Sequence, residues 1–311
     1  MPLFKVSKQS FTSAELSLFD FNFVVPSVPA KALIVKKWPK KTIVIIDKNF
    51  FIGSLYIIIT LIVIIKMFKI MPNNVEKMTF HYSPNFDLKK RSKRSIKYLI
   101  FHYTGMKNDN SAIGKLTNSK SKVSSHYYIT KTGNLIQLVP DLYVAWHAGK
   151  SRWKKDKMIN KNSIGIEISN PGHDYGYENF SKKQINCLIK ISKILINKYR
   201  IKDRNILGHS DIAPLRKKDP GEKFPWKYLS KNKIGTWHKI NSKKCISLRK
   251  KNFNLKLNNF IEKINKYGYC TINLDASSLK KIIKSFQRRF RPELINGKMD
   301  EECYAIIKSL I

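Results

Sequence analysis

The sequence predicts an α/β (α+β) protein with three parts: a mixed central β-sheet flanked by helices, a small C-terminal three-helix module, and an N-terminal transmembrane helix. Strand-like and helix-like segments alternate in mixed order between residues 96 and 237, with hairpin signals among them. Residues 253–311 carry apolar residues at helical spacing. Residues 50–65 form an uncharged apolar run. These three observations define the architecture.

The chain is strongly basic, with a net charge of +39 over 311 residues. The excess Lys is spread along the whole sequence rather than clustered with aromatic residues, so we expect no specific nucleic-acid partner. A general attraction to anionic lipids or polymers remains. The four cysteines show no CxxC pair and no metal-ligand spacing, so they indicate neither a disulfide framework nor a redox state.

The N-terminal region divides into a polar segment and an apolar one. Residues 1–49 are rich in Pro and Lys, and we expect them to be disordered. The apolar run that follows extends to residue 70 if Lys66 and Lys69 snorkel, which makes about 20 residues and suffices to span a bilayer. A buried core helix would show an amphipathic face, and this run has none. No small-residue cleavage site follows the run. We therefore expect residues 50–70 to be an uncleaved single-pass anchor.

The orientation of this anchor is left open by the sequence. Lys and Arg residues flank it on both sides in similar numbers, so the positive-inside rule does not decide. Translation from Met67 or Met71 would remove the anchor altogether.

Residues 71–95 read as an exposed linker, and residues 96–237 as the main folded domain. Short runs of apolar and β-branched residues predict strands in this domain. They lie at residues 96–101, 123–130, 135–139, 163–169 and 205–208. The second and third runs are separated by KTGN, which predicts a hairpin.

Two segments of the domain have clear patterns. Alternation over residues 163–169 places three isoleucines on one face of the strand and Glu167 on the other. Ser181, with Gln184 at the capping-box position, predicts the start of a helix whose apolar spacing continues to Tyr199. The carboxylate of Glu167 is therefore expected opposite the core-facing isoleucines, in a mixed sheet that helices flank.

The C-terminal region begins with a polar linker at residues 238–252. Three helices are expected after it, at residues 255–267, 277–290 and 300–311. Asp300 is a candidate N-cap, and the two glutamates after it complement the helix dipole. So small a module has little apolar surface to bury, so we expect docking to support it.

The candidate chemistry centres on residues 209–226, HSDIAPLRKKDPGEKFPW, which the prolines and glycine predict to be a loop. His209 and Asp219 are good metal ligands, and His102 ends a predicted strand. Two nitrogens and one oxygen are the protein ligands that a catalytic zinc needs, with a fourth position open for water. Glu167 could accept a proton from that water, and Lys217 could stabilise an oxyanion. The assembly suits hydrolysis of an amide, although spacing alone does not show that these residues converge.

Several separated motifs strengthen this interpretation, in the right order along the chain. They are FHYTGM (101–106), VSSHY (123–127), AWHAGKSRW (145–153), NSIGIEISNPGH (162–173) and GHSDIAPLRKKDPGEKFPW (208–226). Together they resemble the zinc-dependent N-acetylmuramoyl-L-alanine amidases of the second type, the AmpD-like enzymes of the amidase and peptidoglycan recognition protein superfamily. The likeness covers about residues 80–237.

The resemblance implies roles for five residues. It assigns one Zn²⁺ ion to His102, His209 and Asp219, the catalytic base to Glu167, and a transition-state partner to Lys217. Recognition proteins and phage lysozymes usually carry Cys as the third ligand, so Asp219 indicates the bacterial amidase branch.

Four further residues are candidates for contact with substrate. His126 and His147 occupy positions outside the zinc triad of this family, and we interpret them as pocket-lining or structural. Trp146 and Trp153 could stack on sugar rings or be buried in the core.

The C-terminal stretches FQRRFRP (286–292) and NGKMDEE (296–302) are similar to a peptidoglycan-binding three-helix module that often follows these amidases. The resemblance implies cleavage between N-acetylmuramic acid and L-alanine, in intact wall or in recycled anhydro-muropeptides. We expect a monomer in the inner membrane with its amidase domain in the periplasm, or a cytoplasmic enzyme if translation starts at Met67 or Met71. The alternatives are a non-catalytic muropeptide receptor and a Lys-rich binder of anionic lipid or nucleic acid.

Overall fold

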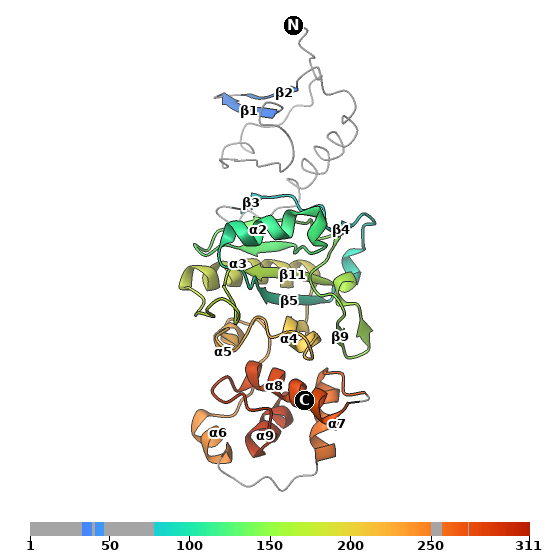
Figure 1. Ribbon diagram of the computed structural model, residues 1–311, viewed down its shortest axis with the longest axis vertical. Coiled ribbons are helices and arrows are strands. Elements are labelled where there is room, and N and C mark those ends of the chain that lie inside the picture. The colour runs from blue at the N-terminus through green and yellow to red at the C-terminus, as the bar shows by residue number, and fades with distance from the viewer. Residues whose placement is uncertain (1–32, 39–40, 47–77, 250–256, 273) are drawn as a thin grey trace.

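A computed structural model describes residues 33–38, 41–46, 78–249, 257–272 and 274–311. Its centre is a six-stranded sheet in the order β12-β5-β11-β6-β7-β3 (Figure 1). The strands are β3 (Met78–Phe80), β5 (Tyr98–Tyr103), β6 (Tyr127–Ile129), β7 (Leu135–Gln137), β11 (Ser163–Ile168) and β12 (Ile206–Gly208). Neighbouring strands are parallel except in the β6–β7 hairpin. The predicted mixed sheet and its hairpin are confirmed.

The remaining regular structure surrounds this sheet. Three small antiparallel pairs are β1 (Leu33–Trp38) with β2 (Lys41–Ile46), β4 (Phe86–Asp87) with β8 (Val144–Ala145), and β9 (Arg152–Trp153) with β10 (Asp156–Lys157). The helices are α2 (Asp109–Thr117), α3 (Lys182–Tyr199), α4 (His209–Ile212), α5 (Trp226–Lys231), α6 (Ser242–Arg249), α7 (Leu257–Tyr267), α8 (Ala276–Phe290) and α9 (Glu301–Leu310).

The two faces of the sheet bury different partners. On β11 the three isoleucines point into a core shared with α3, as their alternation predicts. On β5, Leu99 and Phe101 join the same core, whereas Tyr98 and Ile100 point to the opposite face and pack with the C-terminal helices. The alternation therefore turns His102 and Glu167 away from α3 and toward the face that the C-terminal helices share.

The start of α3 follows the sequence signal. Ser181 is its N-cap, and the backbone N–H of Gln184 donates to the Ser181 hydroxyl at 3.2 Å. In return the backbone N–H of Ser181 donates to the Gln184 side chain at 3.0 Å. Both halves of the predicted capping box are present, and they satisfy backbone donors that the helix itself leaves unpaired.

The C-terminal helices are docked on the sheet. Figure 1 shows them as a layer beside α4 and α5. Apolar residues of α7, α8 and α9 form one continuous core with residues of β5, β9 and β12. Trp153, at the end of β9, lies fully buried in this core, with edge-on contacts to Tyr267 and Tyr269. The expected support by docking is therefore present.

Two segments that the sequence analysis described as linkers contain regular structure. The segment 78–95 is part of the main domain rather than a linker, because β3 and β4 pair with β7 and β8 and because Ser83 and Asn85 are fully buried. The segment 238–252 contains α6, which is tied to α9 by an ion pair between Arg249 and Glu302 at 2.6 Å.

The N-terminal region differs in part from the prediction. Residues 33–38 and 41–46 form the β1–β2 pair, where the sequence suggested disorder. The β-branched residues of both segments favour such pairing. The predicted anchor, residues 50–70, lies outside the described residues. Within the residues that the structure does describe, no helix combines the length and apolarity that a bilayer span requires.

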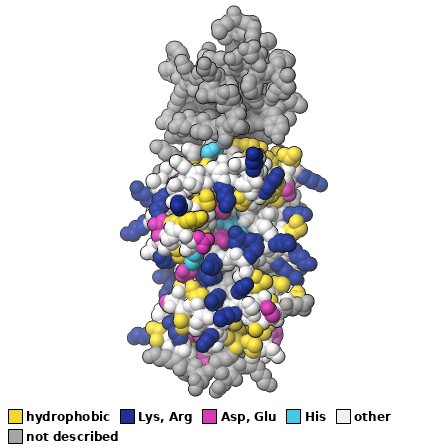
Figure 2. Space-filling view, viewed as in Figure 1, with side chains coloured by type: hydrophobic (Ala, Val, Ile, Leu, Met, Phe, Trp, Pro, Cys, Tyr) yellow, Lys and Arg dark blue, Asp and Glu magenta, His cyan; other side chains and the backbone are white. Residues whose placement is uncertain are grey.

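The basic side chains are dispersed over the surface. Figure 2 shows Lys and Arg distributed across the described part of one face, with acidic and histidine side chains among them near its middle. On this face the positive charge is therefore spread broadly and does not gather into one patch.

Candidate metal centre

His102 reaches the centre from the middle of the sheet. It is the fifth residue of β5, which has β12 on one side and β11 on the other. In the parallel register it lies opposite Glu167 of β11, and its Nδ1 is 4.0 Å from a carboxylate oxygen of that residue. The sheet therefore fixes a candidate ligand and a candidate base side by side.

His209 and Asp219 arrive from the segment after β12. His209 is the first residue of α4, a single helical turn, whereas the prolines and glycine of this segment predict a loop. The chain then leaves the helix and returns, and the backbone N–H of Ser210 donates to the Asp219 carbonyl at 2.8 Å. This bond brings the start and the end of an eleven-residue segment together beside His102.

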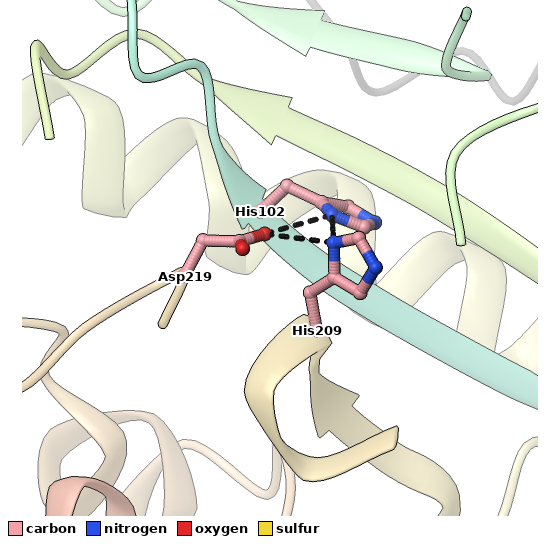
Figure 3. Close-up of side chains that lie close together, drawn as sticks. All are labelled: His102, His209 and Asp219. Atoms are coloured by element: carbon pink, nitrogen blue, oxygen red, sulfur yellow. Dashed lines mark hydrogen bonds and ion pairs between the residues drawn. The ribbon is translucent and has the colours of Figure 1, made fainter. Parts of the chain in front are cut away.

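The three side chains point at one another (Figure 3). The Nδ1 atoms of His102 and His209 are 3.0 Å apart, and Asp219 Oδ2 is 3.0 Å from the first and 3.1 Å from the second. Tetrahedral zinc with bonds of about 2 Å to N and O ligands separates neighbouring donors by about 3.3 Å. The triangle of donor atoms therefore fits one small metal ion. The spacing of the three residues in the sequence did not show this convergence.

The state of the donors also suits a metal. All three side chains are buried. Burial lowers the pKa of His102 to about 4 although its hydrogen bond with Asp219 acts in the opposite direction, so the ring is neutral at pH 7. His209 Nε2 lies 3.1 Å from the carbonyl oxygen of Ala148, an obligate acceptor, and 3.2 Å from the Arg216 guanidinium, an obligate donor. A metal bound at Nδ1 would leave the ring proton on Nε2, where the Ala148 carbonyl can accept it. Neutral imidazoles and a carboxylate are the forms that bind metal.

Glu167 is the most unusual acid of the site. Its Oε2 is buried without a hydrogen-bond partner. Burial, together with the charge of Asp219, raises the pKa of Glu167 well above its usual value of 4.5, and Lys217 opposes that rise. A buried carboxylate whose pKa is raised holds a proton more readily than an ordinary glutamate, which suits a group that takes up a proton and returns it.

Lys217 belongs to the same loop as Asp219 and is partly exposed. Its backbone N–H donates to the Ala213 carbonyl at 3.0 Å. Its positive charge lowers the pKa of both His102 and Glu167.

The four candidate substrate contacts separate into different classes. Trp153 cannot meet a substrate, because it is fully buried under the C-terminal helices. His126 is also fully buried; its Nδ1 accepts from the Gly165 N–H at 3.0 Å, so its role is structural. His147 is buried and contacts His102 rather than open solvent. Trp146 is partly exposed and donates to Asp87 at 2.7 Å, so contact with substrate stays a prediction for this residue.

Sequence reasoning missed two residues at the centre. Arg216 donates to the carbonyl oxygens of Ala148 and Lys150, which closes the loop against residues 148–150. Gly165 lies against the His147 ring, where an added Cβ would come within 2.5 Å of Cγ. A glycine inside an alternating strand is a recognised signal of such a close approach, and it could have been used.

Comparisons with known proteins agree with this geometry. The N-acetylmuramoyl-L-alanine amidase family model matches residues 92–222. The N-acetylmuramoyl-L-alanine amidase AmiD of Escherichia coli K12 is 35% identical over 232 residues, which cover 70% of this chain and 82% of AmiD. The 1,6-anhydro-N-acetylmuramyl-L-alanine amidase AmpD of the same organism is 39% identical over 105 residues, covering 34% of this chain and 55% of AmpD.

Two solved structures share the fold. AmiD of E. coli in complex with anhydro-N-acetylmuramic acid-L-Ala-D-γ-Glu-L-Lys superposes with a TM-score of 0.63 at 33% identity, covering 72% of this chain and 91% of that chain. AmpDh3 of Pseudomonas aeruginosa gives 0.64 at 29% identity, covering 73% and 95%. With its metal triad of His102, His209 and Asp219, the chain therefore belongs to the N-acetylmuramoyl-L-alanine amidases, the enzymes that hydrolyse the amide bond between N-acetylmuramic acid and L-alanine.

Proposed function

We propose that the metal of this amidase is a single zinc ion, with Glu167 as the catalytic base and Lys217 as the partner of the oxyanion. The observation that carries the proposal is the convergence of two Nδ1 atoms and one carboxylate oxygen within 3.1 Å, beside a buried carboxylate oxygen that has no partner. A zinc ion held there would lower the pKa of a water molecule and polarise the scissile carbonyl.

The side chains supply the proton transfers. Glu167 takes a proton from the attacking water as the new C–O bond forms at the lactyl carbonyl of N-acetylmuramic acid. The Lys217 ammonium compensates the negative charge that develops on the carbonyl oxygen. Glu167 then returns the proton to the nitrogen of L-alanine as the C–N bond breaks, which releases a free amine and a lactyl carboxylic acid. The acid then gives up the second proton of the water to the amine, which leaves a carboxylate and an ammonium group. The raised pKa of Glu167 supports both directions of this transfer.

Two substitutions test the assignment and separate a base from a ligand. Glu167→Ala abolishes release of L-alanine peptides but keeps bound zinc, whereas His209→Ala loses both. Glu262→Ala, at an exposed carboxylate of α7, serves as the control and retains activity. Peptide release is followed by chromatography, and zinc content by elemental analysis of the purified protein. Full activity of Glu167→Ala would overturn the mechanism.

The form of the substrate is the second part of the proposal. The solved AmiD and AmpDh3 complexes contain anhydro-muramyl peptides. We propose that this chain accepts muropeptides of the same chemistry as well as intact peptidoglycan, with the C-terminal helices adding contacts to the polymer. Comparing kcat/KM on purified anhydro-muropeptides and on isolated wall distinguishes the two substrates.

The cellular location is proposed on the sequence. The uncharged run at residues 50–65 supports a single-pass anchor in the inner membrane, with the amidase domain in the periplasm where the wall lies. The N-terminus of the protein isolated from cells, combined with fractionation and protease accessibility, tests the anchor and its orientation together.

A further inference from the structure

A row of buried polar groups leads away from the metal triad through His102. The second ring nitrogen of His102, Nε2, is 3.1 Å from Nδ1 of His147. The other nitrogen of His147, Nε2, is 3.1 Å from the hydroxyl of Ser163. That hydroxyl is 2.6 Å from the backbone carbonyl of Ile159. His102 and His147 are at most 5% exposed, and Ser163 is not exposed at all.

The last group of the row fixes the direction of every hydrogen bond. The Ile159 carbonyl can only accept, so the Ser163 O–H donates to it. The Ser163 oxygen then accepts from Nε2–H of His147. In a neutral imidazole the other nitrogen carries a lone pair, so Nδ1 of His147 accepts from Nε2–H of His102. His102 is left with its own lone pair on Nδ1, the atom that faces His209 and Asp219.

We propose that His147 and Ser163 act as positioning residues, which hold His102 in the tautomer and orientation that present Nδ1 to the metal. This positioning role rests on the proposed function in one respect only, which is that His102 is a ligand of the metal triad. The two ligand histidines then differ in construction. His209 donates directly to a backbone carbonyl, whereas His102 reaches its carbonyl through two intervening side chains.

The surroundings are built for this row. Ser163 is the first residue of β11, directly after the 3-10 turn η3 (Ile159–Asn162) that provides the terminal carbonyl. The backbone N–H groups of His147 and Ala148 both donate to the side chain of Asn160, at 3.1 and 2.6 Å, which fixes the backbone that carries the His147 ring. Gly165 provides the space that the ring fills.

The first test is the affinity for Zn²⁺, measured by competition with a chromophoric chelator on the full-length protein. Outer-shell partners of metal-bound histidines typically contribute about 10- to 100-fold in metal affinity. We expect a loss in that range for Ser163→Ala and for His147→Leu. The matched control is Ser192→Ala, because Ser192 is equally buried on α3 and its hydroxyl has no hydrogen-bond partner. Its affinity stays at the wild-type value.

A double-mutant cycle tests the direction of the bonds. In His147→Asn the amide oxygen can take the place of Nδ1, and an amide oxygen accepts without any help from Ser163. We expect His147→Asn to recover most of the affinity that His147→Leu loses. Ser163→Ala then costs little when it is added to His147→Asn, although it costs about 10- to 100-fold in the wild-type background.

The tautomer itself gives a readout that simple destabilisation would not move. Nitrogen NMR of the metal-free protein reports Nε2–H on His102 in the wild type and in Ser192→Ala, and a mixture of tautomers in Ser163→Ala. If His147→Leu fails to fold, the Ser163→Ala and Ser192→Ala pair decides. Equal zinc affinities and equal tautomers in that pair would overturn the proposal. A wild-type protein that binds no zinc would instead overturn the proposed function.

Discussion

The metal triad has two parts that different regions of the molecule hold. One half is His102 on β5, and the other half is His209 with Asp219 on the segment after β12. His102 lies in the middle of a six-stranded sheet, with strands paired on both sides of it. His209 lies on α4, a single turn of four residues that follows the edge strand β12. A single turn has little stability of its own. The first half is therefore rigid by virtue of the sheet, whereas the second depends on its tertiary contacts.

Those contacts come from the C-terminal helices. Asp211 of α4 accepts from Arg289 of α8 at 2.5 Å, and from the Tyr269 hydroxyl at 2.5 Å. The Ser285 hydroxyl donates to the Ser210 carbonyl at 2.6 Å. The same Asp211 carboxylate accepts from the backbone N–H of Gly208 at 2.8 Å, which caps the turn. The C-terminal helices, which the sequence suggested as a wall-binding module, thus support the ligand His209.

The ion pair in this contact is fully buried. Arg289 and Asp211 are 2% and 1% exposed, and the Arg289 guanidinium also donates to the Ile206 carbonyl and lies 4.1 Å from the Trp226 ring. A buried pair adds little stability compared with apolar residues, but removal of one partner leaves an uncompensated charge. Substitutions far from the metal should therefore disturb His209 on α4 more than they disturb His102 on β5.

The largest expected effect follows from breaking that pair. Arg289→Ala leaves the charge of Asp211 buried without its ion-pair partner, which should lower the free energy of unfolding by about 3–5 kcal/mol. Because α4 loosens, zinc affinity should fall as well. Urea denaturation and chelator competition measure the two quantities. Lys281→Ala, at an exposed position of the same helix, should stay within about 0.5 kcal/mol of wild type. Equal stability of the two variants would mean that the C-terminal helices do not support the site.

The sequence predicted the sheet-borne half of the site better than the other half. Alternation in residues 163–169 predicted which face carries Glu167, and the end of a predicted strand marked the place of His102. The helical turn that carries His209, by contrast, was predicted as a loop. Periodicity is a local property, so it reports the direction of a side chain within one element. The motifs then supplied the ligand set.

What the sequence did not predict depends on contacts between distant segments. Asp211 and Arg289 are 78 positions apart, and nothing in either segment marks them as partners. The sequence left sugar stacking open for Trp153 because the helices that bury it lie more than a hundred residues later in the chain. The strands β3 and β4 are only three and two residues long, too short for a period to be recognised. Tertiary packing decided each of these features.

A smaller effect tests the sheet-borne half. In Gly165→Ala the new methyl group would overlap the His147 ring, so the ring must shift from the position in which it contacts His102. Overpacking of this kind costs about 1–3 kcal/mol. Gly114→Ala, in the middle of α2 with no atom within 4 Å of the added Cβ, is the matched control. It should raise stability by up to about 1 kcal/mol. Thermal unfolding distinguishes the two, and an equal response to both substitutions would show that the sheet tolerates displacement of His147.

The smallest effect concerns Glu167. The free-energy cost of burying its carboxylate should appear as a dependence of folding stability on pH. Burial raises the pKa of Glu167 in the folded protein above its usual value of 4.5. Above pH 4.5 the unfolded chain has released a proton that the folded protein still holds, so folding stability falls as pH rises through the raised pKa. Glu167→Gln removes this dependence. In chelator-treated protein the variant should therefore be more stable than wild type at pH 8, with a gain that shrinks toward pH 4. Thermal unfolding at both pH values measures the difference, and a gain that does not change with pH would show that burial of this carboxylate carries no cost.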